Sequence, residues 1–277
     1  MARDTGDIFF STEDGLAESD YVFVEGNRLR ERWRTETHDR PFVIGEIGLG
    51  TGLNLCLTVA QWLAHRPSGA RLHYVGCERA PMKPADMQRA LSHWPDLAPI
   101  ISALLVRWPD PLPGCHRRYF PEWGITLDLW WADAADALQD LASHARPWVD
   151  AWYLDGFAPA RETGPWQQRL YGAMAGLSRA GATFATFTAA GEVKRGLAAS
   201  GFAVSKRPGF GNKRDALCGT IQTPRTVPPV ITPWDLNALS TTPDRALVLG
   251  AGLAGAHAAF ALARRGIPVT VLEANTL

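Results

Sequence analysis

The sequence is poor in cysteine. It contains four among 277 residues, and they form neither a close pair nor a spacing typical of metal sites (Cys56, Cys77, Cys115 and Cys218). This pattern argues against a disulfide-stapled secreted fold and against a cysteine-ligated metal, and it predicts free thiols in a reducing compartment. We therefore expect no metal cofactor.

Long apolar runs are also lacking. No stretch approaches the roughly 20 apolar residues that a membrane-spanning helix needs, and residues 1–7 are too polar for a secretory signal. We expect a cytoplasmic protein with no membrane partner. Nothing in the pattern indicates an oligomeric state.

The chain has no excess of either charge. Lysine and arginine number 28, and so do aspartate and glutamate, which gives a formal net charge of zero. A nucleic acid would therefore have to be held by a local basic patch rather than by overall charge.

A hydrophobic content of 46% is enough to bury a full core in one large domain or two small ones. Strand-like runs alternate with helical ones, which predicts an α/β fold of the Rossmann-like type: a mostly parallel, doubly wound sheet with an antiparallel closing hairpin. The runs are 42–47, 72–77, 126–131, 151–154 and 183–186, with 202–206 and 217–221 as the hairpin.

A proline-rich segment interrupts this periodicity after residue 222. We predict a domain at 1–222, a linker at 223–244 and the beginning of a second domain at 245–277.

The first of two glycine-rich loops follows the predicted strand 42–47. Its sequence is Glu46-Ile47-Gly48-Leu49-Gly50-Thr51-Gly52, and the sixth position counted from Gly48 is a leucine rather than the glycine of a dinucleotide fingerprint. An acid before a loop of this spacing suits the cationic cofactor S-adenosylmethionine, which has no pyrophosphate. We predict that Glu46, Gly48, Gly50 and Gly52 bind it.

Acids follow three further strands, and in a parallel sheet these positions share one edge with the loop. Glu78 could accept from both ribose hydroxyls, Asp133 from the adenine amino group, and Asp155 would lie beside the transferred methyl. Taken alone, each acid also fits a helix cap or a solvated rim.

The second loop carries the complete dinucleotide fingerprint. Gly250, Gly252 and Gly255 lie between an apolar strand and a helix, and Glu273 ends the return strand about 20 residues on, where a ribose hydroxyl would be held. One such strand-helix-strand unit leaves its sheet uncovered and cannot by itself enclose a dinucleotide.

The chain resembles the bifunctional tRNA 5-methylaminomethyl-2-thiouridine biosynthesis family, MnmC, through residue 222 and again from Arg245. The residues that carry the resemblance are Phe10-Ser11, Gly15 to Glu18, Tyr21 to Phe23, Gly26-Asn27, Glu46 to Asn54, Asp155 to Pro159, Trp166 and Gly209 to Arg214.

The resemblance implies an amino-terminal methyltransferase that uses S-adenosylmethionine to methylate the amine of 5-aminomethyl-2-thiouridine in the tRNA anticodon loop. It also implies that a full-length protein carries an FAD-dependent oxidoreductase, which removes a carboxymethyl group from the precursor. Substrate roles for Glu18 and Asn27 rest on the resemblance alone.

For the other substrate contacts, the residues leave two interpretations each. Asp155 would orient the amine by accepting a hydrogen bond from it, or act as the base that helps it lose a proton. Phe157 and Trp166 would stack the flipped uracil or pack in the core. Lys213 and Arg214, with Lys206 and Arg207, would contact phosphates; Arg28, Arg30, Arg32 and Arg34 would track the RNA backbone or line an ordinary exposed strand or loop.

Two alternatives to a tRNA methyltransferase stay open from the sequence. One is a methyltransferase of a small amine or a protein, which the neutral net charge favours. The other is an RNA-binding module that keeps the cofactor loop without catalysis.

Overall fold

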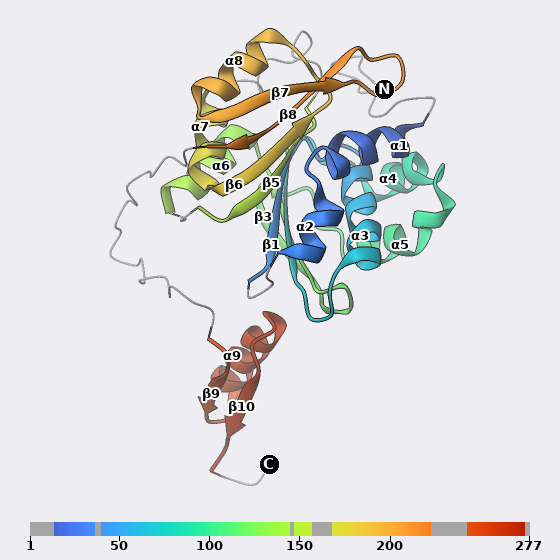
Figure 1. Cartoon of the computed structure of the whole chain (residues 1–277). Helices are drawn as coiled ribbons and strands as arrows, with labels where there is room; N and C mark the ends of the chain where they lie inside the picture. The colour runs from blue at the N-terminus through green and yellow to red at the C-terminus, as the bar shows by residue number, and fades with distance from the viewer. Residues whose placement is uncertain (1–13, 37–39, 145–146, 157–167, 223–242, 275–277) are drawn as a thin grey trace. The chain divides into compact units, whose positions relative to one another are not determined.

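A computed structural model describes residues 14–36, 40–144, 147–156, 168–222 and 243–274, and the chain divides into two compact units, Met1–Val230 and Ile231–Leu277 (Figure 1). The division falls inside the segment 223–244 that the sequence predicts as a linker. Residues 223–242 lie outside the described part, so the exact domain boundaries stay a prediction.

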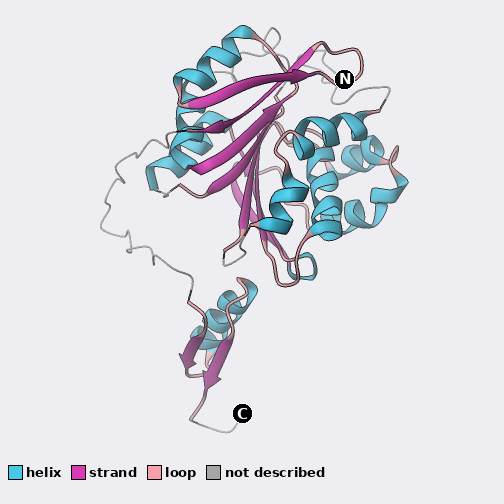
Figure 2. Ribbon diagram, viewed as in Figure 1, coloured by secondary structure: helices cyan, strands magenta, loops and turns pink. Residues whose placement is uncertain are grey.

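The larger unit is built on an eight-stranded sheet (Figure 2) with the order β3-β4-β2-β1-β5-β6-β8-β7. Its strands are β1 Phe42–Ile47, β2 Leu72–Glu78, β3 Gly114–Phe120, β4 Ile125–Trp131, β5 Val149–Leu154, β6 Ser178–Thr186, β7 Phe202–Pro208 and β8 Asp215–Ile221. The five strands from β4 to β6 in this order are parallel, whereas β3, β8 and β7 pair antiparallel. The predicted parallel sheet with a closing hairpin is confirmed.

Helices cover both faces of this sheet, as expected for a doubly wound fold. One face packs against α2 Leu29–Thr35, α3 Leu53–His65, α4 Pro84–Leu91 and α5 Ala98–Val106, and the other against α6 Ala134–His144, α7 Gln168–Leu177 and α8 Gly191–Ala199. The short helix α1 Gly15–Ser19 is followed directly by a π-helical segment, Asp20–Glu25. The apolar residues of this segment pack in the hydrophobic core on the face of the sheet that α2 to α5 cover.

Strand β3 was missed by the sequence analysis. It forms one edge of the sheet, and its residues are mostly half-buried or exposed, so they include basic side chains such as Arg117 and Arg118 rather than an apolar run. Its pairing with β4 is stabilised by a tertiary contact, because Arg117 donates two hydrogen bonds, of 2.7 and 2.6 Å, to Asp128 on β4.

The arginine-rich segment around residue 30 also differs from expectation. Its every-second-residue pattern suggested an exposed strand or loop, but the structure forms helix α2. Leu29 and Trp33, four residues apart, are both completely buried, and this helical spacing of the two apolar anchors decides the conformation.

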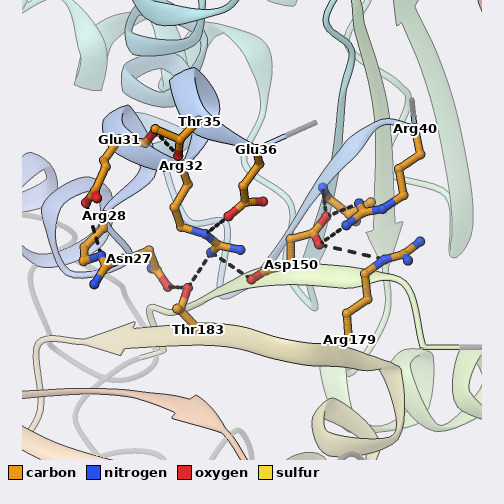
Figure 3. Close-up of polar contacts among 11 residues, drawn as sticks. Asn27, Arg28, Glu31, Arg32, Thr35, Glu36, Arg40, Asp150, Arg179 and Thr183 are labelled. Carbon is orange, nitrogen blue, oxygen red and sulfur yellow. Dashed lines mark hydrogen bonds and ion pairs between the residues drawn. The ribbon is translucent and has the colours of Figure 1, made fainter. Parts of the chain in front are cut away.

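A polar cluster pins the beginning of β5, at the end of the strand opposite to Asp155 (Figure 3). The buried carboxylate of Asp150 accepts hydrogen bonds of 2.7 and 2.8 Å from Arg40 and 2.8 Å from the backbone N–H of Val43, and Arg179 lies 3.8 Å away. These contacts tie β5 to β1, the two strands whose carboxyl ends bear the candidate site.

The smaller unit consists of β9 Ala246–Leu249, α9 Leu253–Arg264 and β10 Val269–Leu272, with the two strands parallel. Its apolar side chains are largely exposed; Leu249 is 76% and Phe260 is 60% accessible. This agrees with the expectation that one strand-helix-strand unit leaves its faces uncovered. Across the described residues of both units, no helix has the length and apolarity to cross a membrane.

Candidate active site at the carboxyl ends of the strands

The first glycine loop connects β1 to α3 and depends on backbone conformations that favour glycine. Gly48, Gly50 and Gly52 have φ angles of +82°, +53° and +78°. A side chain on Gly48 would begin 2.1 Å from the backbone oxygen of Asp155, so the loop passes directly against the end of β5. The N–H of Gly48 also donates to the carbonyl of Cys77 at 3.0 Å, which fixes the loop to β2.

Glu46 lies beneath this loop. Alternation along β1 turns it to the same face as Ile44, toward α3, and its side chain is completely buried. The carboxyl group accepts hydrogen bonds from the Tyr74 hydroxyl at 2.7 Å and from Nδ2 of Asn54 at 2.8 Å. A direct cofactor contact does not fit this burial, so we replace that prediction with a role exerted through neighbouring side chains.

The amide of Asn54 joins Glu46 to Asp155. Its Nδ2 atom also donates to Oδ2 of Asp155, at 2.6 Å. Asn54 is the second residue of α3, so the turn that shapes the glycine loop also places this amide between the two carboxyl groups. The sequence analysis did not single out Asn54 or Tyr74 as functional, although Asn54 stands within the segment Glu46 to Asn54 on which the resemblance rests.

Both carboxyl groups have raised pKa values. Burial raises the pKa of Glu46 to about 8, aided by the charge of Asp155 and opposed by the hydrogen bonds from Tyr74 and Asn54. Burial likewise raises the pKa of Asp155 to about 7; the Asn54 hydrogen bond and Lys213 lower it, while Glu18 and Glu78 raise it. A carboxyl group that titrates near neutrality at a strand end is a candidate for proton-linked chemistry.

Glu78 ends β2 and caps the loop from the other side. Its Oε2 accepts from the N–H of Gly50 at 3.0 Å and its Oε1 from the N–H of Ala80 at 2.8 Å. Each carboxylate oxygen has a second lone pair, so Glu78 keeps the capacity to accept from a ribose hydroxyl while it orders the loop.

Asp133 follows β4 and caps α6. Its Oδ1 accepts from the N–H groups of Ala135 and Asp136, at 3.0 and 3.2 Å, and Arg169 lies 3.3 Å from the same oxygen. The helix-cap interpretation therefore applies to Oδ1, and the predicted adenine contact stays a prediction.

Glu18 and Lys213, 195 residues apart, form an ion pair that joins α1 to the loop between β7 and β8. The Lys213 ammonium also lies 4.9 Å from the centre of the Phe187 ring. Because both charges act on the pKa of Asp155, the structure brings these two predicted substrate residues to the candidate catalytic carboxylate.

Two other basic residues of this hairpin are engaged by protein groups. Lys206 donates to Asp215 at 2.8 Å, and Arg207 stacks on the Tyr21 ring and donates to the Tyr21 carbonyl at 3.0 Å. Arg214 is exposed, and within the described residues no hydrogen bond or ion pair of its side chain is recorded. Arg214 is thus the more available of the predicted phosphate contacts.

The predicted substrate contact of Asn27 does not fit the structure. The side chain is completely buried; Nδ2 donates to the carbonyls of Phe23 and Trp152, at 3.0 and 3.2 Å, and Oδ1 accepts from Thr183 at 2.6 Å. Asn27 therefore joins the amino-terminal helices to β5 and β6 (Figure 3).

The predicted backbone-tracking role does not fit two of the four arginines at and within α2 either. Arg32 donates to the Asp150 carbonyl at 3.1 Å and to Thr183 at 2.9 Å (Figure 3). Arg30 pairs with Asp20 and donates to Gln61 at 2.8 Å. Arg28 and Arg34 are exposed. Phe157 and Trp166 lie outside the described residues, so their predicted stacking on uracil stays a prediction.

The second glycine loop, in the smaller unit, has the backbone of a dinucleotide turn. Gly250 has a φ of +93°, and a side chain on Gly255 would begin 1.9 Å from the Gly250 carbonyl oxygen, so the helix packs closely on the turn. Glu273 accepts from the N–H of Ala251 at 2.6 Å. Gly252 is the N-cap of α9, and nothing within 4 Å would obstruct a side chain there.

No group of three or more histidine, cysteine, aspartate or glutamate side chains within the described ranges is arranged to hold a metal ion. All four cysteines are free thiols.

Comparisons with known proteins match a methyltransferase family in the larger unit and a Rossmann-like family in the smaller one. A family described as S-adenosyl-L-methionine-dependent methyltransferase matches residues 95–222, and a family described as NAD(P)-binding Rossmann-like domain matches residues 248–276. The crystal structure of MNMC2 from Aquifex aeolicus has a TM-score of 0.61 and 20% identity, covering 79% of this chain and 66% of that one, and shows a shared fold.

A curated relative extends the likeness along the sequence. The tRNA 5-methylaminomethyl-2-thiouridine biosynthesis bifunctional protein MnmC of Chromohalobacter salexigens is 49% identical over 97% of this chain, which spans 38% of the relative's length. With the methyltransferase match and the shared fold, this identity shows that the chain belongs to the MnmC family and corresponds to its methyltransferase part.

Proposed function

We propose that this protein transfers a methyl group from S-adenosylmethionine to the amine of 5-aminomethyl-2-thiouridine at the wobble position of tRNA. The observation that carries the proposal is the half-buried Asp155 carboxyl group, held at the end of β5 against the glycine loop. The name of the 49% identical relative supports the tRNA substrate.

The residues present fit the cofactor. Gly48, Gly50 and Gly52 have left-handed backbone conformations and carry no side chain that would block a close approach to the loop at these positions, and Glu78 supplies carboxylate acceptors beside it. The loop would hold the methionine portion, Glu78 the ribose and Asp133 the adenine. When bound, S-adenosylmethionine supplies a methyl group on a sulfonium, which an uncharged amine takes by in-line displacement.

Asp155 has the position and the acidity for the protein's part in this reaction. Its carboxylate accepts a hydrogen bond from the amine and aims the nitrogen lone pair, so that rate enhancement comes mainly from orientation. A fully ionised carboxylate would favour the unreactive ammonium form. Because its pKa is raised to about 7, Asp155 is partly protonated near neutrality and favours the ammonium form less.

We further infer that residues 1–222 form the methyltransferase domain, 223–244 a linker and 245–277 the start of a second domain. Gly250, Gly252, Gly255 and Glu273 would there hold the dinucleotide FAD. The carboxymethyl-removing activity would belong to that second domain.

The proposal is tested by transfer of labelled methyl to tRNA bearing 5-aminomethyl-2-thiouridine. The comparison is between the wild-type chain, Asp155→Ala and the control Asp96→Ala, which removes an exposed carboxylate. Label should appear in the wobble nucleoside with the wild type and the control, and fall sharply with Asp155→Ala. Cofactor binding without label in any tRNA would instead favour a small-amine or protein substrate, or a non-catalytic RNA-binding module.

A further inference from the structure

Glu46 and Asp155 both place a carboxyl group beside the glycine loop, but the proposed methyl transfer uses only that of Asp155. Asp155 stands at the strand end, whereas Glu46 is sealed under the loop with no exposed surface. Burying a second ionisable group costs free energy unless it is paired or neutral. Its presence therefore calls for a function of the contacts that it makes.

Those contacts converge on the amide of Asn54. The Nδ2 atom carries two hydrogens, and it lies 2.8 Å from Oε1 of Glu46 and 2.6 Å from Oδ2 of Asp155. One hydrogen can therefore go to each carboxyl group. On the far side of Glu46, the Tyr74 hydroxyl occupies Oε2 at 2.7 Å, so the whole chain of contacts is fixed at its buried end.

The orientation of the Asn54 amide that makes this bridge leaves its oxygen without a hydrogen-bond partner among the described residues. Asn54 is only 4% exposed, yet its Oδ1 has no hydrogen-bond partner in the part of the chain that the structure describes. Buried acceptors without partners are uncommon and cluster where function overrides stability. The opposite orientation of the amide would set its oxygen against both carboxyl groups and require both to be protonated.

The bridge acts on one oxygen of Asp155 only. Oδ2 is held by Asn54, while the described residues provide no recorded partner for Oδ1. A carboxylate held at one oxygen cannot rotate freely about its Cβ–Cγ bond, so the other oxygen keeps one direction. The raised pKa of Glu46 is consistent with this arrangement, because a neutral Glu46 anchors Asn54 without a second buried negative charge.

We propose that Asn54 is a positioning residue for the methyl transfer: anchored by Glu46 and Tyr74, its amide holds Oδ2 of Asp155 and thereby presents Oδ1 to the substrate amine. This inference rests on the proposed function for its consequence, but the contact that it invokes can be measured without cofactor or tRNA.

The test compares Asn54→Leu with Thr58→Val. Leucine has the same branching at Cγ and the same number of side-chain heavy atoms as asparagine, and it has no hydrogen-bond donor. Thr58 lies one turn further along α3, is also buried, and bonds Tyr153 at 3.1 Å without contacting either carboxyl group. Thr58→Val therefore reproduces the loss of a buried hydrogen bond in the same helix. If Asn54→Leu does not fold, Asn54→Ala serves in its place.

The first readout is the titration of the Asp155 carboxyl carbon by NMR, with the resonance assigned by its absence in Asp155→Asn. The other charged groups that act on Asp155, Lys213, Glu18 and Glu78, are unchanged in both variants. Because the Asn54 hydrogen bond stabilises the carboxylate, Asn54→Leu should raise the pKa of Asp155, and Thr58→Val should leave it unchanged. An unchanged titration in Asn54→Leu would overturn the proposal.

The second readout is methyl transfer. Loss of orientation should lower kcat by roughly 10- to 100-fold, leave KM for tRNA nearly unchanged, and move the acid limb of the kcat profile to higher pH; Thr58→Val should do none of these. A uniform loss at all pH values would contradict positioning through Asp155. Absence of transfer by the wild-type chain would refute the proposed function instead, while the NMR titration would still decide the Asn54 contact.

Discussion

The backbone oxygen of Asp155 lies 2.1 Å from the position at which a side chain on Gly48 would begin. Atoms cannot approach so closely, so any side chain at Gly48 would push the glycine loop away from the end of β5. The contact joins the cofactor loop to the candidate catalytic carboxylate through the backbone itself.

Gly48→Ala should therefore destabilise the protein by about 2 kcal/mol or more and weaken S-adenosylmethionine binding. Gly69→Ala is the matched control, since Gly69 has a similar φ of +75° but nothing within 4 Å of the added carbon. The control should cost only about 1 kcal/mol, from backbone strain alone. Urea unfolding and cofactor titration measure both effects, and equal losses in the two variants would refute the close-contact explanation.

Glu46 should make stability depend on pH. Its folded pKa of about 8 exceeds its ordinary value of 4.5, so its contribution to stability is complete below pH 4.5 and is lost as the pH rises through 8. Glu46→Gln stays neutral at all pH values. Its free energy of unfolding relative to that of the wild type should therefore rise by roughly 2–3 kcal/mol between pH 6 and pH 9. Chemical unfolding at both pH values measures the difference. Glu122→Gln changes an exposed carboxylate, and its stability relative to the wild type should not rise with pH in this way. A rise of the same size in this control would show that Glu46 is not the cause.

Lys213 and Glu18 should shift the acidity of Asp155 in opposite directions. Lys213 lowers the pKa of Asp155 and Glu18 raises it. Lys213→Met should therefore move the acid limb of the methyl-transfer profile to higher pH, and Glu18→Gln to lower pH. Lys206→Met, which removes a charge paired with Asp215 on the same hairpin, should leave the limb in place. Shifts of the same sign in the first two variants would contradict this electrostatic arrangement.

Asn27 should prove structural. Asn27→Ala leaves the Thr183 hydroxyl and the carbonyls of Phe23 and Trp152 without their partner. We expect a loss of about 1–3 kcal/mol in the free energy of unfolding and little change in KM for tRNA once the variant is folded. Arg34→Ala, at an exposed position, should stay within about 0.5 kcal/mol of the wild type. A stable Asn27→Ala with a large KM increase would restore the substrate role.

Arg214 should contribute to tRNA binding through a phosphate. Arg214→Ala should weaken binding of all tRNA sequences alike and reduce the slope of log K against log salt concentration by about 1. Lys194→Ala, which removes an exposed charge on α8, is the control and should leave the slope unchanged. Binding measured across a salt series decides the matter, and an unaltered slope for Arg214→Ala would exclude the phosphate contact.

Much of the site was accessible from the sequence because its signals are local. The spacing of Gly48, Gly50 and Gly52 predicts a left-handed backbone conformation at these positions, since only glycine readily adopts it. The acids Glu78 and Asp155 follow apolar runs, and parallel strands bring such ends to one edge. Phe157 and Trp166 were inferred from residue type and resemblance, and no described contact tests them.

Other features could not be predicted from local sequence. Strand β3 is an edge strand without an apolar run, and its place depends on pairing with β4. The arginines of α2 form a sequence pattern that is also typical of an exposed strand or loop. In the structure, Leu29 and Trp33 are buried in the core, and Arg32 therefore faces β5 and β6.

By itself, the sequence determined the two glycine-rich loops, the alternation of strands and helices, and the strand-helix-strand pattern of the second unit, because glycine spacing and apolar periodicity act within a few residues. Only the tertiary structure decided that Asn54 bridges Glu46 and Asp155, that Lys213 meets Glu18, and that Asn27 is internal. These contacts join residues up to 195 positions apart. Burial beside particular partners, rather than residue type, sets the acidity of Glu46 and Asp155.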